Sequence, residues 1–488
     1  MTRVYLFLLC CVWLLLVVRC GGEGERVAAV STPLNASTPT HAVVLTNTAV
    51  PPTPTQPLAT DTPMGMETAL LPTITVTVSP TTAVPTETPT ITPISLPPLP
   101  GEIYFFWDSK HLPRGEVFDP VQTLYRISGE NLKDVEISTV ADEIIGWPYI
   151  SLSPDKTAFL FTKLEDRNGD GNVSFEGYNQ GFDGPNIFTY SLINRSVTRI
   201  TKDFPTVINP EWGEGDETIL FGQSTSGLSS IHVANGITQL VAAFPEDLIT
   251  WTDVSPNGRL IGINLDSILI SIVDQQTGEV TGVTHEIGGL GVERAWSPDS
   301  KWLLLNQPFT NRRFLVNVQT LTASPLMGLT SFQSFAWPPD SQKLTFVQDT
   351  GDGSSLMSLD PTDLSTRKLF SVPGSIHNLF WSPDGSHLAM TISVGEKIAL
   401  HILDAETGEL RELWQNSDSK RFYIAAWSPD GEWLLFFRGR GWPLSHGPDD
   451  EAGIYITHQS GGEAHLILDT SNASDPYGFF WLPEIQVP

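Results

Sequence analysis

The sequence predicts an all-β protein, a β-propeller of eight four-stranded blades. Three observations lead to this prediction: a repeated peptide, its even spacing and the strand-like segments at the two ends of the repeats. The peptide Trp-Ser-Pro-Asp-Gly stands at Trp381–Gly385 and again at Trp427–Gly431. With altered copies included, it begins at positions 152, 212, 254, 296, 337, 381 and 427, so the gaps are 60, 42, 42, 41, 44 and 46 residues. Repeats of roughly 40–50 residues are typical of propeller blades.

Each repeat reads as four short strands joined by tight turns. In the sixth copy the apolar or alternating stretches are Asn378–Trp381, His387–Thr391, Ile398–Leu403 and Glu409–Trp414. Pro-Asp-Gly forms the first turn, because Pro presets φ and Asp and Gly accept the remaining turn conformations. Four such strands make one blade, and we expect the motif Trp to pack between neighbouring blades.

The two ends of the repeat array complement each other. Tyr477–Pro483 reads as one more first strand, whereas Glu102–Trp107, Gln122–Ile127 and Asp134–Ser138 read as three strands that lack a first strand. Pairing one C-terminal strand with three N-terminal strands would close the ring and remove exposed sheet edges. This closure predicts eight blades, and seven would result if the terminal strands did not join.

On these motifs, residues 101–488 resemble the TolB-like family of WD-repeat-related β-propellers. The resemblance implies the propeller fold. TolB itself is a periplasmic protein with a separate α/β domain ahead of its propeller, and residues 21–100 do not look like such a domain. Its role in an envelope complex is therefore not carried over. The same propeller type caps prolyl-oligopeptidase-like enzymes, but no hydrolase-like segment is recognised in this sequence.

Residues 1–20 read as an export leader. Val4–Val18 is an apolar run of fifteen residues, short for a membrane-spanning helix and typical of a signal-peptide core. The run ends at Cys20, which resembles the lipidated Cys of bacterial lipoproteins, although Arg19 stands where that family has a small residue. We therefore expect an exported protein anchored at the cell envelope through lipidated Cys20. An uncleaved signal anchor and a freely secreted protein are the alternatives.

Residues 21–100 read as a disordered spacer. Residues 31–100 contain 15 Pro and 19 Thr, and such a composition does not bury enough apolar surface to fold. All three cysteines, Cys10, Cys11 and Cys20, lie in the leader, so the propeller at 101–488 has neither a disulfide nor thiolate chemistry.

The charge of the chain excludes one class of partner. The net charge is −28, with 27 Lys and Arg against 55 Asp and Glu. Residues 1–100 contain 3 basic and 5 acidic residues, which leaves 24 against 50, or −26, for the propeller. Nucleic-acid backbones are bound through Lys and Arg, so we expect no nucleic-acid partner and no membrane contact beyond the N-terminal anchor.

One loop of the first repeat resembles the calcium loops of EF-hand and dockerin-type sites. Oxygen-bearing side chains recur at alternate positions, Gly171 occupies the sharp turn, and Gly177 stands where the family has a bidentate Glu. The sequence therefore predicts a structural Ca²⁺ site, with an Asn- and Gly-rich solvated hairpin as the alternative. Its candidate ligands are Asp166, Asn168, Asp170, Asn172, Glu176 and Asp183.

Three connections between second and third strands are long, and loops carry function while the framework repeats. They are Asp108–Pro120, Lys163–Pro185 and Arg438–Ala452, in consecutive blades around the ring. We expect them to form one raised sector on the face opposite the Pro-Asp-Gly turns. The candidate partner-binding residues there are His111, Arg114, Trp442, His446, Asp449 and Asp450. Tolerated insertions without a binding role are the alternative.

The sequence has no Gly-x-Ser-x-Gly elbow, HExxH motif, Walker loop or dinucleotide fingerprint. We therefore expect a monomeric, non-enzymatic module, tethered at the envelope, that binds a protein or peptide. A carbohydrate-binding or sensing module is the alternative, followed by an enzyme with its site in the central channel.

Overall fold

The computed structural model describes the propeller strands and most of the turns between them. The described residues are 99–107, 121–129, 136–145, 150–166, 183–201, 208–223, 227–244, 249–265, 269–284, 293–307, 312–326, 332–415, 421–439, 452–470 and 476–484. Within these ranges the chain forms strands and one short 3-10 helix, η1 (Glu214–Asp216). No helix there has the length and hydropathy needed to cross a membrane. The predicted leader and nearly all of the predicted spacer lie outside the described residues.

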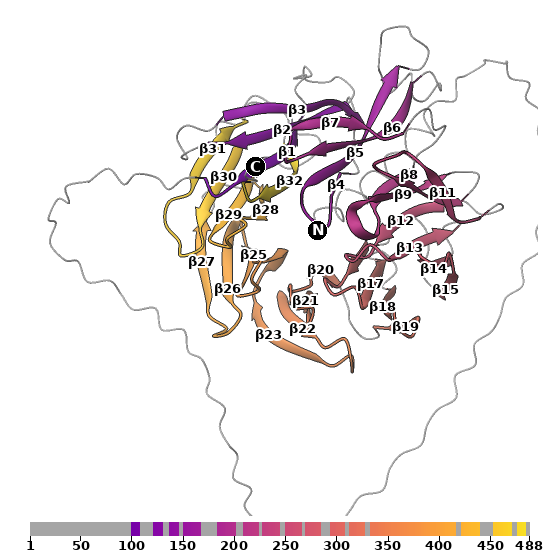
Figure 1. The fold of residues 1–488 in the computed structure, drawn as a ribbon. Coiled ribbons are helices and arrows are strands. Elements are labelled where there is room, and N and C mark those ends of the chain that lie inside the picture. The colour runs from indigo at the N-terminus through magenta and orange to yellow at the C-terminus, as the bar shows by residue number, and fades with distance from the viewer. Residues whose placement is uncertain are drawn as a thin grey trace, which may run out of the picture. The chain divides into compact units, whose positions relative to one another are not determined.

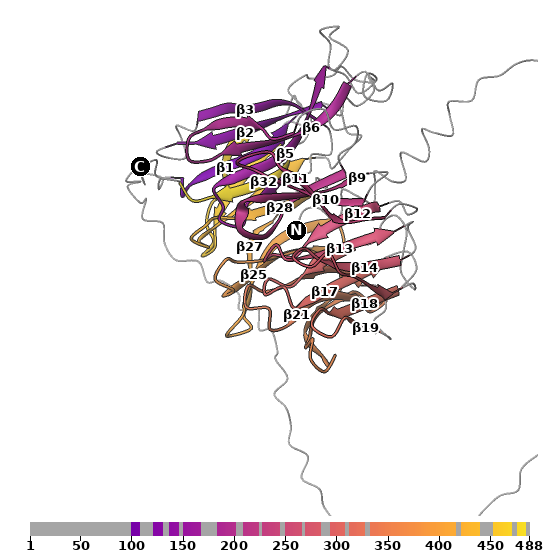
Figure 2. The same ribbon diagram turned by 45° about the vertical axis from the view of Figure 1, so that its right-hand side comes forward.

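Six blades are separate four-stranded antiparallel sheets whose strands follow chain order from the middle of the ring outward (Figures 1 and 2). Blades 2, 3 and 4 consist of β8 (Ile208–Trp212), β9 (Thr218–Gln223), β10 (Gly227–His232), β11 (Thr238–Ala242), β12 (Ile249–Val254), β13 (Leu260–Leu265), β14 (Leu269–Asp274), β15 (Val280–Thr284), β16 (Glu293–Trp296), β17 (Trp302–Gln307), β18 (Arg312–Asn317) and β19 (Thr322–Pro325). Blades 5, 6 and 7 consist of β20 (Phe332–Ala336), β21 (Leu344–Asp349), β22 (Ser354–Leu359), β23 (Thr366–Val372), β24 (Ser375–Trp381), β25 (His387–Val394), β26 (Lys397–Asp404), β27 (Leu410–Gln415), β28 (Arg421–Trp427), β29 (Trp433–Gly439), β30 (Gly453–His458) and β31 (His465–Asp469).

The remaining eight strands form two further blades that share one sheet. The closing blade consists of β32 (Tyr477–Leu482), β1 (Glu102–Trp107), β2 (Val121–Ser128) and β3 (Glu136–Ile145), and blade 1 of β4 (Ser151–Leu152), β5 (Ala158–Asp166), β6 (Asp183–Ser191) and β7 (Ser196–Arg199). Six separate sheets and these two make eight blades, which confirms the prediction. The third predicted strand was too short, because β3 continues to Ile145 and pairs with β5 at Ile144 and Lys163.

The ring closes through antiparallel pairing of the two ends of the repeat array. Ile103 of β1 pairs with Trp481 of β32, which confirms the predicted closure by one C-terminal and three N-terminal strands. A partly buried ion cluster ties this blade to blade 1. Arg195, in the turn between β6 and β7, donates to both carboxylate oxygens of Glu102 at 2.8 and 2.9 Å. Burial, together with the Glu102 carboxylate that accepts its hydroxyl at 2.9 Å, raises the pKa of Tyr104.

The recurring motif forms a turn that is stabilised by its own side chains. In blade 4, Ser297 is fully buried, accepts the N–H of Trp302 at 2.9 Å and donates to the Asp299 carboxylate at 2.7 Å. The fifth motif position has a left-handed backbone, with φ of 61° at Ser300 and 75° at Gly385. Gly adopts this conformation without a steric penalty, and Ser is tolerated there at some cost.

The motif Trp joins neighbouring blades, as predicted. Its indole N–H donates to the backbone carbonyl of the residue before the motif in the preceding blade. The bonds are Trp212 to Ser151 (3.1 Å), Trp296 to Asp253 (3.3 Å), Trp337 to Ala295 (3.3 Å) and Trp427 to Phe380 (3.0 Å). Two of these residues differ: the indole nitrogen of Trp381 is buried and has no hydrogen-bond partner, and that of Trp481 in the closing blade donates to the Pro100 carbonyl at 2.9 Å.

The innermost strands are bulged three residues ahead of the motif Trp. Asn209, Asn378 and Gly478 have φ of 45°, 54° and 66°, and the pairing of their strands shifts register close to these residues. A bulge bends the strand and increases its local twist. Asn and Gly are the residue types that tolerate the left-handed backbone such a bulge needs.

Two matched substitutions test the contribution of the indole bond. Trp427→Phe removes the bond to Phe380 and leaves a carbonyl without its donor, so we expect a loss of about 1–3 kcal/mol in unfolding free energy. Trp381→Phe removes a similar volume but no hydrogen bond, so its loss should be smaller. The urea midpoints of the two variants measure the difference, and equal midpoints would contradict the role given to the bond.

Candidate functional site

The predicted calcium loop is described only at its two ends. β5 ends at Asp166 and β6 begins at Asp183, and these two residues are directly opposite each other in the antiparallel register. Asn168, Asp170, Asn172 and Glu176 lie outside the described residues. The backbone therefore brings the first and the last predicted ligand to facing positions of two paired strands. No cluster of three or more His, Cys, Asp or Glu side chains suited to a metal occurs within the described ranges.

The predicted partner-binding residues belong to the connections after β1, β5 and β29. These are second-to-third strand connections of the closing blade, blade 1 and blade 7, which are consecutive in the ring. The residues themselves, His111, Arg114, Trp442, His446, Asp449 and Asp450, lie outside the described part of the chain, as does Cys20. Their role in binding therefore stays a prediction.

A different set of polar residues lies on the innermost strands. We call the residue directly before the first motif position the wall position. Around the ring the wall position is held by Ser151, Glu211, Asp253, Ala295, Ala336, Phe380, Ala426 and Phe480. The first three of these residues are polar and belong to consecutive blades, whereas the other five are apolar.

Wall-position side chains contact the next blade. Ser151 of blade 1 donates to the Glu211 carboxylate of blade 2 at 3.2 Å, and Phe480 of the closing blade packs against Phe159 of blade 1 with ring centroids 5.2 Å apart. Asp253 of blade 3 lies 3.9 Å from the guanidinium of Arg294 on the inner strand of blade 4. The polar wall residues and Arg294 thus form one series across blades 1 to 4, which we call the polar wall.

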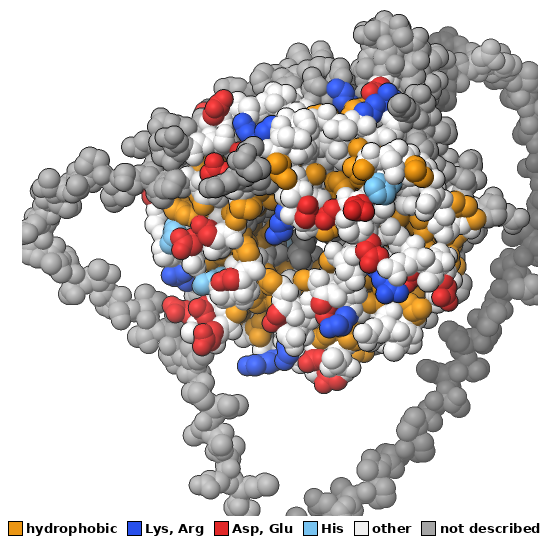
Figure 3. All heavy atoms as spheres, in the orientation of Figure 1, with side chains coloured by type: hydrophobic (Ala, Val, Ile, Leu, Met, Phe, Trp, Pro, Cys, Tyr) orange, Lys and Arg blue, Asp and Glu red, His pale blue; other side chains and the backbone are white. Residues whose placement is uncertain are grey.

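The polar wall combines groups suited to proton transfer and to anion binding. Glu211 is 7% exposed, and the side chains of Asp253 and Arg294 are 22% and 16% exposed. The inner strands of blades 2 and 3 are in direct contact, because the Thr252 hydroxyl donates to the Asn209 carbonyl at 3.1 Å. The space-filling view shows a hollow at the middle of the ring with acidic and basic side chains around it (Figure 3).

Charged groups in a protein interior are costly unless they are paired or have a function. The apolar wall residues of blades 4 to 7 and of the closing blade show that the fold itself does not need a charge at this position. A carboxylate beside a guanidinium can transfer a proton and hold an anionic group of a substrate. The polar wall is therefore the best candidate for a functional site among the described residues.

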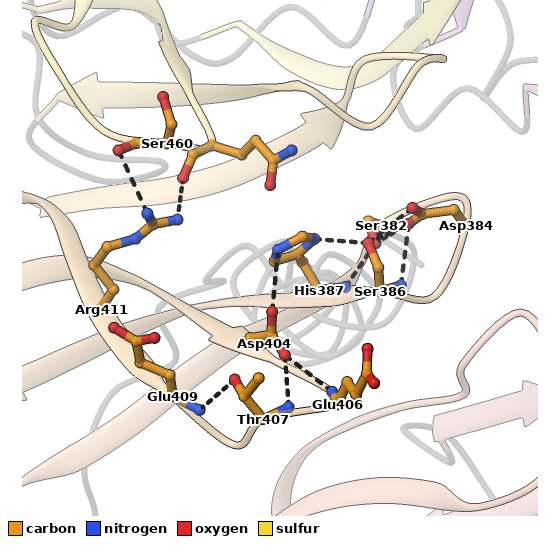
Figure 4. A network of polar contacts seen from close by, with 11 residues as sticks. Ser382, Asp384, Ser386, His387, Asp404, Glu406, Thr407, Glu409, Arg411 and Ser460 are labelled. Carbon is orange, nitrogen blue, oxygen red and sulfur yellow. Dashed lines mark hydrogen bonds and ion pairs between the residues drawn. The ribbon is translucent and has the colours of Figure 1, made fainter.

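A second polar network, in blade 6, contains a Ser, a His and an Asp (Figure 4). The Ser386 hydroxyl lies 2.7 Å from His387 Nδ1, and His387 Nε2 lies 3.9 Å from the Asp404 carboxylate. The same hydroxyl lies 2.8 Å from both carboxylate oxygens of Asp384. It has a single proton, so the carboxylate competes with the imidazole as its acceptor.

The aspartate that lies beside His387 in this network has a structural role. Asp404 accepts the backbone N–H groups of Glu406 and Thr407 at 3.0 and 2.7 Å, which stabilises the turn between β26 and β27. Asp274 accepts two backbone N–H groups in the same way at the equivalent turn of blade 3, where no His is present. The blade 6 network therefore stabilises turns, and we assign it no catalytic role.

No protein-family model matches the chain. The uncharacterized peptidase YuxL of Bacillus subtilis is 26% identical over an alignment that covers 20% of this chain and 20% of that protein. An oligogalacturonate lyase in complex with manganese has 15% identity and a TM-score of 0.44, and covers 75% of this chain and 98% of its own. A putative TolB from Agrobacterium tumefaciens has 15% identity and a TM-score of 0.33, with 51% and 94% covered.

The solved structures to which the chain is similar thus include a putative TolB, and the curated relative corrects the functional expectation. The expectation of a non-enzymatic binding module was wrong, since the curated relative is a peptidase by name. The inference from missing motifs failed because the searched motifs belong to other folds. A propeller site is assembled from separate blades and leaves no short motif in the sequence.

The stability of the fold depends on pH through the ionisation of the motif carboxylates. Hydrogen bonds from Ser382 and Ser386 lower the pKa of Asp384 to about 2, below the ordinary value of about 3.9. A lowered folded-state pKa stabilises the protein above pH 4, and this contribution is lost as the pH falls from 4 to 2. Asp384→Asn should reduce the pH dependence of the urea midpoint over this range. Asn257 already fills the same position in blade 3, so the turn should persist.

Proposed function

We propose that the protein is an acid–base enzyme that acts on an anionic substrate in the channel of the propeller. The single observation that carries the proposal is the polar wall, which places two carboxylates and a guanidinium on consecutive inner strands. In this proposal Asp253 transfers the proton and Arg294 binds the anionic group of the substrate. Glu211, which accepts the Ser151 hydroxyl, is a second, buried carboxylate on the neighbouring inner strand.

Acidic peptides are the first substrates to examine. The name of the Bacillus subtilis relative supports peptide substrates, although this chain covers only 20% of its length. Arg294 supports an acidic side chain or a C-terminal carboxylate as the anionic group. Peptide-bond cleavage needs a base that takes a proton from the attacking water and passes it to the leaving amine, and the ionised Asp253 carboxylate can do both.

The test compares turnover by the full chain and three variants. A panel of acidic peptides, oligouronates and phosphate esters is incubated with the protein and analysed by mass spectrometry. Asp253→Asn should lower turnover roughly 10²- to 10⁴-fold, the usual contribution of acid–base catalysis. Arg294→Gln should mainly raise KM for anionic substrates. Glu217→Gln is the control, because its side chain is 77% exposed and pairs with His232 away from the wall.

Two results would overturn the proposal. One is the absence of turnover for the whole panel with the unaltered chain. The other is full activity of both Asp253→Asn and Arg294→Gln, which would place any observed reaction elsewhere in the molecule.

We also propose that residues 166–183 bind Ca²⁺ and that the ion orders this connection. The facing register of Asp166 and Asp183 supports the proposal, together with the alternate oxygen-bearing residues between them. Terbium luminescence should titrate to saturation with the unaltered chain and fall to background for Asp166→Ala combined with Asp170→Ala. Asp352→Ala, in the equivalent connection of blade 5, is the control. Unchanged terbium binding by the double variant would remove the site.

The TolB-like and WD-repeat-related assignment of the repeats and the tethering at the cell envelope are further proposals. They are supported by the Trp-Ser-Pro-Asp-Gly copies and by the leader that ends at Cys20. Incorporation of labelled fatty acid into the chain, and its loss in Cys20→Ser, would identify the anchor.

A further inference from the structure

We propose that the outer edge of blade 2 is a dimer interface, and that the partner it binds is a second copy of this chain. The proposal concerns the outside of the ring and does not depend on the reaction assigned to the polar wall. It departs from the monomer expected from the sequence.

The outermost strand of blade 2 has a free edge with exposed apolar side chains. β11 is the last strand of its sheet, so one of its two edges pairs with no strand. It lies at the margin of the ring, where the space-filling view shows hydrophobic side chains (Figures 1 and 3). Leu240 is 58% exposed and Ile237, beside the strand, is 56% exposed, the two highest values among the large apolar side chains of the described residues. Such an edge can pair with a strand of another molecule.

The outer strands of the other blades have features that oppose this kind of pairing. β3, β7, β23, β27 and β31 each contain at least one charged residue, such as Arg367 and Lys368 of β23. β19 ends in Pro325, and β15 contains Gly282, which has no side chain to pack. Residues 233–245, which include all of β11, contain no charged residue. The outer edge of blade 2 is therefore the edge best suited to an added strand.

The hydrogen bonds to β10 show which backbone groups of β11 reach the free edge. The carbonyl of Ile237 accepts the N–H of His232 at 2.9 Å, so the backbone groups of Ile237 are directed towards β10. Successive residues of a strand direct these groups to alternate edges, so those of Thr238 and Leu240 are directed away from β10. The free edge ends at Val241, where the pairing with β10 shifts register and Gly278 of blade 3 lies against the carbonyl.

This short edge is complementary to itself. A twofold axis at Gln239 places Thr238 of one copy opposite Leu240 of the second copy, and the reverse. The outward N–H and C=O groups of both residues then meet acceptors and donors on the other strand, in the antiparallel arrangement that a twofold axis requires.

Charge favours a second copy as the partner. Each propeller has 24 basic and 50 acidic residues, so two copies repel each other except where the surface is uncharged. Pairing of β11 with itself brings no like charges together, whereas β23 paired with itself would bring together Arg367 and Lys368 of both copies. The contact is small, so we expect a dimer that dissociates on dilution.

A cysteine at the twofold axis of the full chain tests this arrangement. Residues that face each other in a non-hydrogen-bonded antiparallel pair have Cα atoms about 4.5 Å apart, within the range of a disulfide. Gln239→Cys should therefore form a disulfide between two copies under mild oxidation. Mass spectrometry of the linked peptides distinguishes it from disulfides of the leader cysteines. Arg367→Cys is the control, because Arg367 is exposed and has the equivalent place in β23.

Sedimentation velocity of the full chain without an added cysteine should show a monomer–dimer equilibrium that shifts with protein concentration. Leu240→Lys should weaken the dimer roughly tenfold or more, because it replaces an apolar contact by a charge that is repeated in the other copy. Leu369→Lys makes the same change at an exposed residue of β23 and should leave the equilibrium unaltered.

The proposal is overturned by a monomer at every concentration, by equal cross-linking of Gln239→Cys and Arg367→Cys, or by a dimer that Leu240→Lys does not weaken. Cross-linking of position 239 in intact cells to a different protein, in place of the homodimer, would also overturn it, since this edge would then have another partner.

Discussion

Closure of the ring by β1 and β32 is the constraint on which the other features depend. A single blade cannot bury both of its faces, so each blade is stable only between two neighbours, and the first and last repeats need each other. The antiparallel pairing of Ile103 with Trp481 meets this need within one sheet. The bidentate, partly buried pair of Arg195 and Glu102 then fixes the closing blade against blade 1. Removal of either connection would leave apolar blade faces exposed to water.

The fold was predictable because its repeating parts are local. Ser297, Asp299 and the left-handed fifth residue stabilise a turn within five residues, so the sequence shows this unit wherever it occurs. The number of blades followed from the spacing, and the closure followed from counting strands at both ends. The length of β3 was missed, since its last residues are held by pairing with β5 of the next blade, a contact that the local pattern does not contain.

The candidate site was missed for the opposite reason. Glu211, Asp253 and Arg294 are separated by about forty residues each and come together only when blades 2, 3 and 4 are placed side by side. One signal was present in the sequence. When the repeats are aligned on the motif, the residue before it is Ser, Glu and Asp in the first three copies and Ala or Phe in the others. A charge in a column that is otherwise apolar marks a position that packing alone does not explain.

The bulges at Asn209, Asn378 and Gly478 have a consequence for any peptide that enters the channel. Each first strand has a neighbour on one side only, so its other edge has backbone groups available to an added strand. An extended peptide needs several residues of even edge to pair with, and the bulges interrupt the edge after a few residues. The bulged edges therefore offer an added strand only short stretches of backbone to pair with, and the inner strands resist edge-to-edge addition by other chains.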